Sequence, residues 1–484
     1  MGDIETGAAK RESFDAYSLI IGFTGSPGSG CSFLAEGIVS VLGGHDGRRH
    51  GHYYKVSDFL RQEAKRRSLP ETVANLQTLG DEFRRKEGLS VLVEKCLEQV
   101  KEDDRIANFS QDEETVILID GIKNEGEVKY LRQFANFYLV SVHADRDTRE
   151  ARLVGDSAPD RRFNTHEEFV TADRRDEEEE IVNGQQIKRC NYLADIIVIN
   201  DKKLTTGRQK TEIYQRFVDD YIYPMRKVRK GERPHERPPR VEETLMTMAY
   251  CASKRSSCLK RKVGAVIAYV RSIEDEYPDA HIDEATDRDI PFQVVSVGYN
   301  DIPLGTPCVF SEWKTCYREY LQEERAKALK NCWNCGELLP VSIKCAHCGS
   351  ENASRSLRCS ECDSDLLADY ACQKCGHRVF SICLPGEEGM PGKLLDMCRA
   401  LHAEESAILG LAGISKGGHG QLVLYTTTFP CNLCANKIVA AGIRRVYYAE
   451  PYTMKESEEL LQRCGVKTTR FEGIKSTAYF RLYV

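Results

Sequence analysis

The first 225 residues alternate between short apolar runs and longer amphipathic stretches. The apolar runs occupy residues 18–23, 116–119, 137–142 and 194–200. Runs of this length, in which apolar residues are nearly continuous, are typical of strands covered on both faces of a parallel sheet. Apolar residues at helical spacing, from Phe33 to Val41, follow the first run. We therefore expect residues 17–225 to form an α/β domain with a parallel sheet, preceded by a tail at residues 1–16.

A second alternation of helices and strands occupies residues 241–484. Helical patterns occur at residues 241–257, near His402 and after Pro430, and strands are expected at residues 263–268, 294–297, 422–425 and 446–449. Residues 226–240, between the two halves, contain seven basic residues and three prolines. This composition predicts a semi-rigid linker. Contact of its charges with a polyanion is the open alternative.

Composition narrows the class of protein. A length of 484 residues predicts two or three domains, and 41% hydrophobic residues are typical of a globular protein. The net charge of −6 gives no global attraction to nucleic acid. We find no apolar run of bilayer length and no signal-peptide pattern in residues 1–15, so no membrane partner is expected. Ten of the 20 cysteines form CxxC pairs, which favours metal binding in a reducing cytoplasmic location.

A glycine-rich loop, Gly-Ser-Pro-Gly-Ser-Gly-Cys-Ser, follows the first apolar run and precedes a helix. This is the context of a P-loop, whose backbone N–H groups bind phosphates. Cys31 stands where the consensus has a lysine, which weakens the case for phosphoryl transfer and leaves a loop without ligand as the alternative. Asp120 follows the second run, a position from which P-loop proteins hold Mg²⁺. The predicted nucleotide-binding residues are Gly25, Ser26, Gly28, Ser29, Gly30, Cys31, Ser32 and Asp120.

A histidine and a cysteine pair in the second half have the spacing of a catalytic zinc site. The chain reads His402-Ala403-Glu404 and, after 25 intervening residues, Pro430-Cys431-Asn432-Leu433-Cys434. Three protein ligands, His402, Cys431 and Cys434, would leave the fourth zinc position to water. H-x-E followed by P-C-x-x-C is the pattern of zinc nucleobase deaminases. Zinc would lower the pKa of its water to about 7, and Glu404 would carry protons to the ring and to the leaving ammonia.

An insert at residues 330–378 contains eight further cysteines in four CxxC pairs. The second four repeat the first four at a constant offset of 27 residues. This repeat predicts two structural zinc sites with four thiolates each, in tandem zinc ribbons. Sequential pairing is the simpler connectivity, and interleaved pairing stays open. Nucleic-acid binding, gating of the active site and assembly are open roles. The predicted ligands are Cys332, Cys335, Cys345, Cys348, Cys359, Cys362, Cys372 and Cys375.

The second half resembles the deoxycytidylate deaminase family. The resemblance rests on the strand Val263-Gly264-Ala265-Val266-Ile267, the loop Gly298-Tyr299-Asn300, and the zinc motif, in the family's order. Asp301 replaces a family glycine in that loop. The resemblance implies that Asn300 contacts the sugar of a substrate. The basic residues Arg255, Lys260 and Lys262 are candidates for the substrate phosphate, and surface solvation is the alternative.

The first half resembles small P-loop kinases, and the whole chain resembles bacterial antiviral dCTP deaminases, which fuse the two domain types. The resemblance implies a P-loop kinase-like parallel-sheet domain followed by a cytidine deaminase-like α/β/α domain with a tandem zinc-ribbon insert. It also implies conversion of dCTP and dCMP to dUTP and dUMP during phage infection. The P-loop domain would then be a regulatory nucleotide sensor. A regulatory RNA or protein and a homo-oligomer are compatible with this picture.

Two other functions remain open from the sequence. The first is a deaminase that edits RNA or single-stranded DNA with the ribbons as its grip, although the acidic balance weighs against it. The second is a nucleic-acid-binding regulator with a vestigial deaminase site, against which the intact ligands and Glu404 argue. An activity assay separates the three functions. Turnover of free nucleotides indicates the nucleotide deaminase, editing of oligonucleotides indicates the editing enzyme, and absence of product indicates the regulator.

Overall fold

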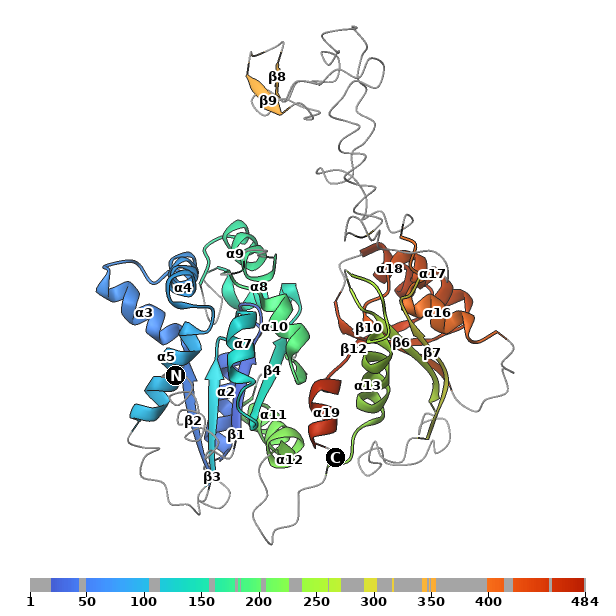
Figure 1. The fold of residues 1–484 in the computed structure, drawn as a ribbon, viewed down its shortest axis with the longest axis horizontal. Helices are drawn as coiled ribbons and strands as arrows, with labels where there is room; N and C mark the ends of the chain where they lie inside the picture. The colour runs from blue at the N-terminus through green and yellow to red at the C-terminus, as the bar shows by residue number, and fades with distance from the viewer. Residues whose placement is uncertain are drawn as a thin grey trace, which may run out of the picture.

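The protein is built around two sheets that lie side by side (Figure 1). No helix in the described part of the chain is long and apolar enough to cross a membrane. The computed structural model describes residues 19–42, 49–103, 114–155, 162–178, 182, 184–201, 206–225, 237–259, 261–270, 291–302, 316, 342–345, 348, 350–353, 398–412, 421–451 and 455–482.

The N-terminal sheet has six strands in the order β13-β5-β4-β1-β3-β2. All neighbouring pairs are parallel except β13 with β5. The predicted parallel sheet is therefore confirmed, and the four apolar runs form β1, β3, β4 and β5. The strands are β1 (Leu19–Thr24), β2 (Arg49–Lys55), β3 (Glu114–Asp120), β4 (Phe137–His143), β5 (Ile196–Ile199) and β13 (Gly473–Ile474).

Helices cover both faces of this sheet, which explains why its central strands are apolar throughout. One core contains residues of α3, α4, α5, α7 and α10, and the other contains residues of α2, α11 and the π-helix. Helix α8 adds Leu153 to a small cluster with α9. The helices are α2 (Cys31–Leu42), α3 (Val56–Arg66), α4 (Val73–Glu87), α5 (Val91–Glu102), α7 (Glu125–Leu131), α8 (Arg146–Leu153), α9 (His166–Glu178), α10 (Ile187–Leu193), α11 (Gly207–Phe217), the π-helix η1 (Val218–Ile222) and α12 (Tyr223–Met225).

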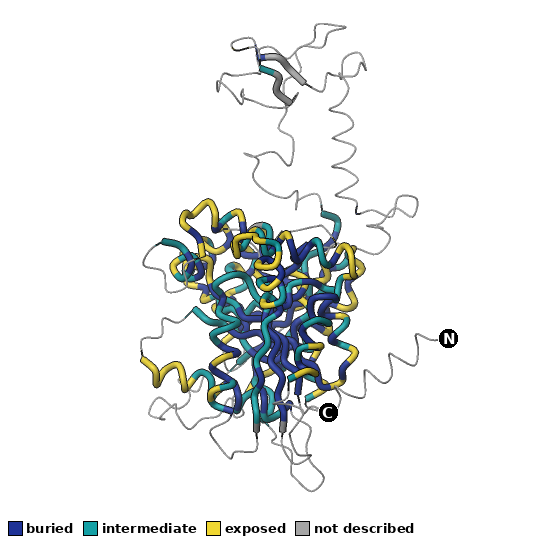
Figure 2. Tube along the Cα trace, turned by 90° about the vertical axis from the view of Figure 1, so that its left-hand side faces the viewer, coloured by how far each residue is buried: buried dark blue, intermediate teal, exposed yellow. Residues whose placement is uncertain are grey.

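The C-terminal sheet has the order β12-β11-β10-β6-β7 and is mixed. Helix α13 packs on one face, while α16, α17 and α18 pack on the other, an α/β/α arrangement. Its strands are β6 (Gly264–Val270), β7 (Phe292–Tyr299), β10 (Gln421–Thr428), β11 (Arg445–Glu450) and β12 (Lys467–Arg470). Its helices are α13 (Val241–Ser253), α16 (Ala403–Leu409), α17 (Asn432–Ala440) and α18 (Lys455–Arg463). Buried strands occupy the middle of the molecule, and exposed residues lie mainly toward its outside (Figure 2).

The end of the chain joins the two sheets. Strand β13 pairs with β5 of the N-terminal sheet, and α19 (Ser476–Leu482) packs against α13. Ile474 and Ala478 belong to a core of the N-terminal sheet, whereas Ile197 of β5 belongs to a core of the C-terminal sheet. The division at residues 225 and 241 stays a prediction, but residues after Phe471 contribute to the N-terminal half.

A small hairpin carries the second cysteine pair of the insert. Strands β8 (Ser342–Lys344) and β9 (Glu351–Ala353) are antiparallel, and Cys345 and Cys348 lie in the connection between them. Cys345 is buried and Cys348 is exposed. The ribbons stay a prediction, because the other six predicted ligands, Cys332, Cys335, Cys359, Cys362, Cys372 and Cys375, lie outside the described residues.

Candidate active site

His402 is the N-cap of α16, with an extended backbone at φ −72° and ψ 154°. Its position is fixed from the preceding residue, because Leu401 and Asp301 exchange two backbone hydrogen bonds of 2.8 and 3.2 Å. Gly298 of β7 lets α16 approach closely, since a Cβ at this position would lie 2.2 Å from the carbonyl oxygen of Ala403. The loop after β7 therefore positions the start of α16.

The two cysteines enter the site from the start of α17. Cys431 is the N-cap of this helix and Cys434 lies in its first turn. The helix begins at Asn432, two residues later than the sequence predicts from Pro430. The hydroxyl of Ser457 donates to the carbonyl oxygen of Pro430 at 2.7 Å, which anchors the turn before the cysteines. The positive end of the helix dipole favours thiolates here.

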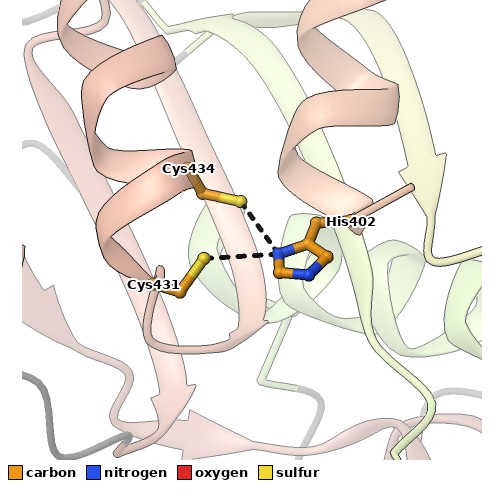
Figure 3. A group of neighbouring side chains, drawn as sticks. All are labelled: His402, Cys431 and Cys434. Atoms are coloured by element: carbon orange, nitrogen blue, oxygen red, sulfur yellow. Dashed lines mark hydrogen bonds between the residues drawn. The ribbon is translucent and has the colours of Figure 1, made fainter. Parts of the chain in front are cut away.

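The imidazole and the two sulfurs converge as the sequence predicts (Figure 3). His402 Nδ1 lies 3.3 Å from the Sγ atoms of both Cys431 and Cys434. Zinc–sulfur bonds of about 2.3 Å and zinc–nitrogen bonds of about 2.05 Å would place these atoms about 3.6 Å apart around a tetrahedral ion. One nitrogen and two sulfurs at this separation fit a zinc ion, with a fourth position left for water.

The Glu404 carboxylate lies beside these ligands and is 4% exposed. Its Oε2 is 3.7 Å from the sulfur of Cys434, and its Oε1 accepts a hydrogen bond of 3.4 Å from the hydroxyl of Thr426. Burial raises the pKa of Glu404 above its ordinary value. A raised pKa makes this carboxylate a better proton acceptor than an exposed one, which suits a group that takes and returns a proton.

The hydrogen bond between the two thiols shifts their pKa values in opposite directions. The hydrogen bond from Cys434, with help from His402, lowers the pKa of Cys431 to about 4. The same bond to Cys431, together with burial, raises the pKa of Cys434. The hydrogen bond to Cys431 raises the pKa of His402.

The predicted substrate residues lie in different surroundings. The amide of Asn300 donates to the carbonyl oxygen of Arg261 at 2.8 Å and accepts from the N–H of Val263 at 2.7 Å, so it orders the loop before β6. Lys262 is exposed, and Lys260 lies outside the described residues. Arg255 lies over the ring of Tyr299 at 5.6 Å and lines a cavity of about 480 Å³ between α13, β7 and α19, in which the zinc-site residues take no part.

The predicted P-loop connects β1 to α2. Gly28 and Gly30 have φ values of +82° and +100°, which explains the need for glycine there. Ser32 donates to Asp120 at 2.6 Å, so these two predicted residues meet. Gly25, Ser26 and Ser29 lie in the same loop, and Cys31 is the first residue of α2.

Sequence reasoning missed the side chains that hold this loop. Asn200 donates to the carbonyl oxygen of Ser29 at 2.7 Å, and Arg152 donates to that of Gly28 at 2.9 Å. Lys55 contacts Ser32. Asn200 and Lys55 each stand at or directly after the end of a parallel strand, which is the signal that could have found them.

The two halves of the chain are similar to different groups of known proteins. A family model described as the cytidine and deoxycytidylate deaminase zinc-binding region matches residues 293–450. A UPF0200 protein from Methanothrix thermoacetophila is 33% identical over 195 residues, which are 40% of this chain and 94% of that protein.

Deaminases appear among both relatives and solved structures. A deoxycytidylate deaminase from Schizosaccharomyces pombe is 27% identical over 286 residues, which are 58% of this chain and 56% of the yeast protein. The crystal structure of a dCMP deaminase from cyanophage S-TIM5 shares 17% identity, with 49% of this chain and all of that chain covered, at a TM-score of 0.22. Through its N-terminal region the chain belongs to the UPF0200 family, and a domain of the deoxycytidylate deaminase family is fused to that region.

Proposed function

We propose that the chain is a zinc-dependent hydrolytic deaminase that converts the deoxycytidine nucleotides dCMP and dCTP to dUMP and dUTP. The observation that carries the proposal is the buried Glu404 carboxylate beside the convergent donors of His402, Cys431 and Cys434. Similarity to deoxycytidylate deaminases supports the nucleotide class of the substrate. The extension to dCTP follows the resemblance of the fused chain to dCTP deaminases.

The proposed mechanism assigns proton transfer to Glu404. A zinc ion held by the three ligands would supply a water with a pKa near 7. Glu404 would take a proton from the attacking water and give it to the cytosine ring nitrogen next to the amino-bearing carbon, to which the water oxygen would add. Glu404 then carries the remaining proton to the amino group, and ammonia leaves as the uracil carbonyl forms. The Thr426 hydroxyl lies 3.4 Å from Oε1 of this carboxylate and 3.0 Å from the carbonyl oxygen of Thr428, so its one hydrogen can be given to either acceptor.

Substrate orientation is proposed to come from the loops at the same end of the sheet. Asn300 holds residues 261–263 in place through its two amide contacts, which leaves one amide hydrogen for a sugar hydroxyl. Arg261 and Lys262 are both exposed directly before β6, and Arg261 also lies 3.6 Å from Glu450, which offsets part of its charge. We assign the substrate phosphate to this stretch, with Lys260 and Arg255 as further candidates.

The N-terminal region is proposed to bind a regulatory nucleotide without transferring phosphate. The glycine loop, Ser32 and Asp120 support nucleotide binding, and Cys31 in the place of the consensus lysine argues against transfer. The resemblance to antiviral dCTP deaminases suggests a role in depleting dCTP during phage infection. The cysteine pairs suggest a reducing cytoplasmic location.

A panel of substrates tests the proposed reaction. Purified protein is incubated with dCMP, dCTP, CTP and a cytosine-containing single-stranded oligonucleotide, and ammonia and uracil products are followed. We expect turnover of dCMP and dCTP. Product from the oligonucleotide alone would assign the editing function instead, and absence of any product from zinc-loaded protein would contradict the proposal.

A further inference from the structure

The P-loop of this chain carries no positive charge at the consensus lysine position. Cys31 is the first residue of α2, and its sulfur lies 3.5 Å from the hydroxyl of Ser29. Burial raises the pKa of this thiol to about 12. The side chain is therefore neutral at cellular pH, and it cannot balance the charge of a phosphate.

A cation reaches the loop from a different strand. Lys55 is the last residue of β2, where it pairs in register with Asp120 at the end of β3. Its Nζ donates to the hydroxyl of Ser32 at 2.9 Å and lies 3.9 Å from a carboxylate oxygen of Asp120. The side chain is 24% exposed. The ammonium group thus lies next to the residue that follows Cys31, with one side open to solvent.

These contacts also determine whether Asp120 can bind the Mg²⁺ that the sequence predicts there. P-loop proteins hold this ion with the loop serine and a strand-end aspartate. Here Oδ2 of Asp120 accepts hydrogen bonds from Ser32 at 2.6 Å and from the hydroxyl of Tyr53 at 2.9 Å. The ammonium of Lys55 lies against the same pair, and its like charge would repel a divalent cation. Ser32 and Asp120 in this arrangement do not fit Mg²⁺.

We propose that Lys55 supplies the positive charge of this P-loop, so that the site binds a polyphosphate group without a divalent cation. The ligand class is a nucleoside polyphosphate whose phosphate chain lies between the glycine-loop N–H groups and Lys55. No phosphoryl group is transferred. This inference rests on the proposed nucleotide-binding role of the N-terminal region and adds which side chain binds the phosphates.

The test is calorimetric binding of inorganic triphosphate, ATP and GTP to the zinc-loaded full chain, in buffer with Mg²⁺ and in buffer without added divalent cations. We expect the wild-type chain to bind at least one probe equally well in both buffers. Lys55→Met should weaken binding about 10- to 100-fold, because a hydrogen bond to a charged group is lost. Lys55→Arg should retain most of the affinity. Lys65→Met is the matched control, since Lys65 is exposed and pairs with Glu71 on the surface.

A double variant tests whether the charge itself is what matters. Adding Cys31→Lys to Lys55→Met moves the cation to the consensus position and should restore binding, provided that thermal melting shows a folded protein. Binding that requires Mg²⁺, or that Lys55→Met leaves unchanged, would overturn the inference while nucleotide binding stands. Failure of the wild-type chain to bind any probe would overturn both. Ammonia release from dCMP is scored separately, so the deaminase proposal is judged independently.

Discussion

A guanidinium nitrogen of Arg470 in β12 lies 2.8 Å from Nδ1 of His143 in β4, and this hydrogen bond joins the two sheets. An arginine can only donate, so Nδ1 accepts, and the proton of the ring is on Nε2, 2.8 Å from the hydroxyl of Ser141. Burial, with Arg470 nearby, holds the pKa of His143 well below its ordinary value. The contact thus requires a neutral imidazole.

Removing the contact between Arg470 and His143 should lower the stability of the folded protein. We expect Arg470→Ala to lower the free energy of unfolding by about 1–2 kcal/mol, because a partly buried, charge-assisted hydrogen bond is lost. Urea unfolding followed by circular dichroism measures the change. Arg463→Ala, at an exposed position of α18, is the control and should have little effect. Equal stability of the two variants would show that the contact does not support the joint.

Lys475, beside β13, should make stability depend on pH in the alkaline range. Its Nζ donates to the carbonyl oxygens of Asn191 at 3.2 Å and Tyr192 at 2.7 Å, and it lies 5.0 Å from the centre of the Tyr250 ring. Burial lowers its pKa from 10.5 to about 8. The charged groups that act on it are Glu450, Asp195, Lys254 and Arg132.

Below pH 8 Lys475 is charged in the folded and unfolded states, and the cost of burying the charge is fully present. Between pH 8 and 10.5 only the unfolded state keeps the proton, so the stability of the folded state rises with pH. The gain should be about 3 kcal/mol, since one pKa unit corresponds to about 1.4 kcal/mol. Unfolding of the wild type and of Lys475→Met across this range measures it as their difference, which cancels most tyrosine titration. A constant difference would contradict the assignment.

Gly298 should be intolerant of a side chain. A Cβ at this position would lie 2.2 Å from the carbonyl oxygen of Ala403 and 2.4 Å from the N–H nitrogen of Ala407, and neither backbone atom can move without displacing α16. We expect Gly298→Ala to cost about 1–3 kcal/mol of stability and to lower kcat by shifting His402 and Glu404. Gly207→Ala, with nothing within 4 Å of its Cβ, is the control. Melting curves and deamination rates that match the control would refute this packing argument.

Much of the fold was predictable because its central strands are buried on both faces. The apolar runs became β1, β3, β4 and β5. Strand β2, with the sequence Arg-His-Gly-His-Tyr-Tyr-Lys, has no such run and was missed, because its place comes from pairing with β3. Strand β13 has only two residues, and its partner lies far away in the sequence. Neither β2 nor β13 could be predicted from the pattern of apolar residues along the chain.

Polar contacts between residues far apart in the sequence could not be predicted from the sequence either. The acidic run from Asp176 to Glu180 has the charge pattern of a solvated helix face, and yet Asp176 is fully buried. Gln77 donates to its carboxylate at 2.6 Å and Lys123 lies 2.9 Å away. The zinc ligands, by contrast, could be predicted, because two short motifs of fixed spacing carry them.

Metal content should follow the ligands of the zinc site. We expect Cys434→Ser to lower bound zinc by about one ion per chain and to abolish deamination, because a hydroxyl replaces a thiolate in a three-ligand site. Cys251→Ser, which changes an exposed cysteine of α13, should leave both unchanged. Elemental analysis of the purified proteins measures the difference. Equal zinc in the two variants would mean that the ion is not held by Cys434.

Replacement of the Glu404 carboxylate shows whether this residue moves protons in a zinc-dependent deamination. Glu404→Gln keeps the size of the side chain and the three ligands but removes the proton carrier. Deamination of dCMP is measured for both proteins, with zinc content determined on the same samples. We expect kcat to fall at least about 100-fold while the zinc content stays unchanged. Retained turnover by the variant, or loss of zinc together with activity, would contradict it.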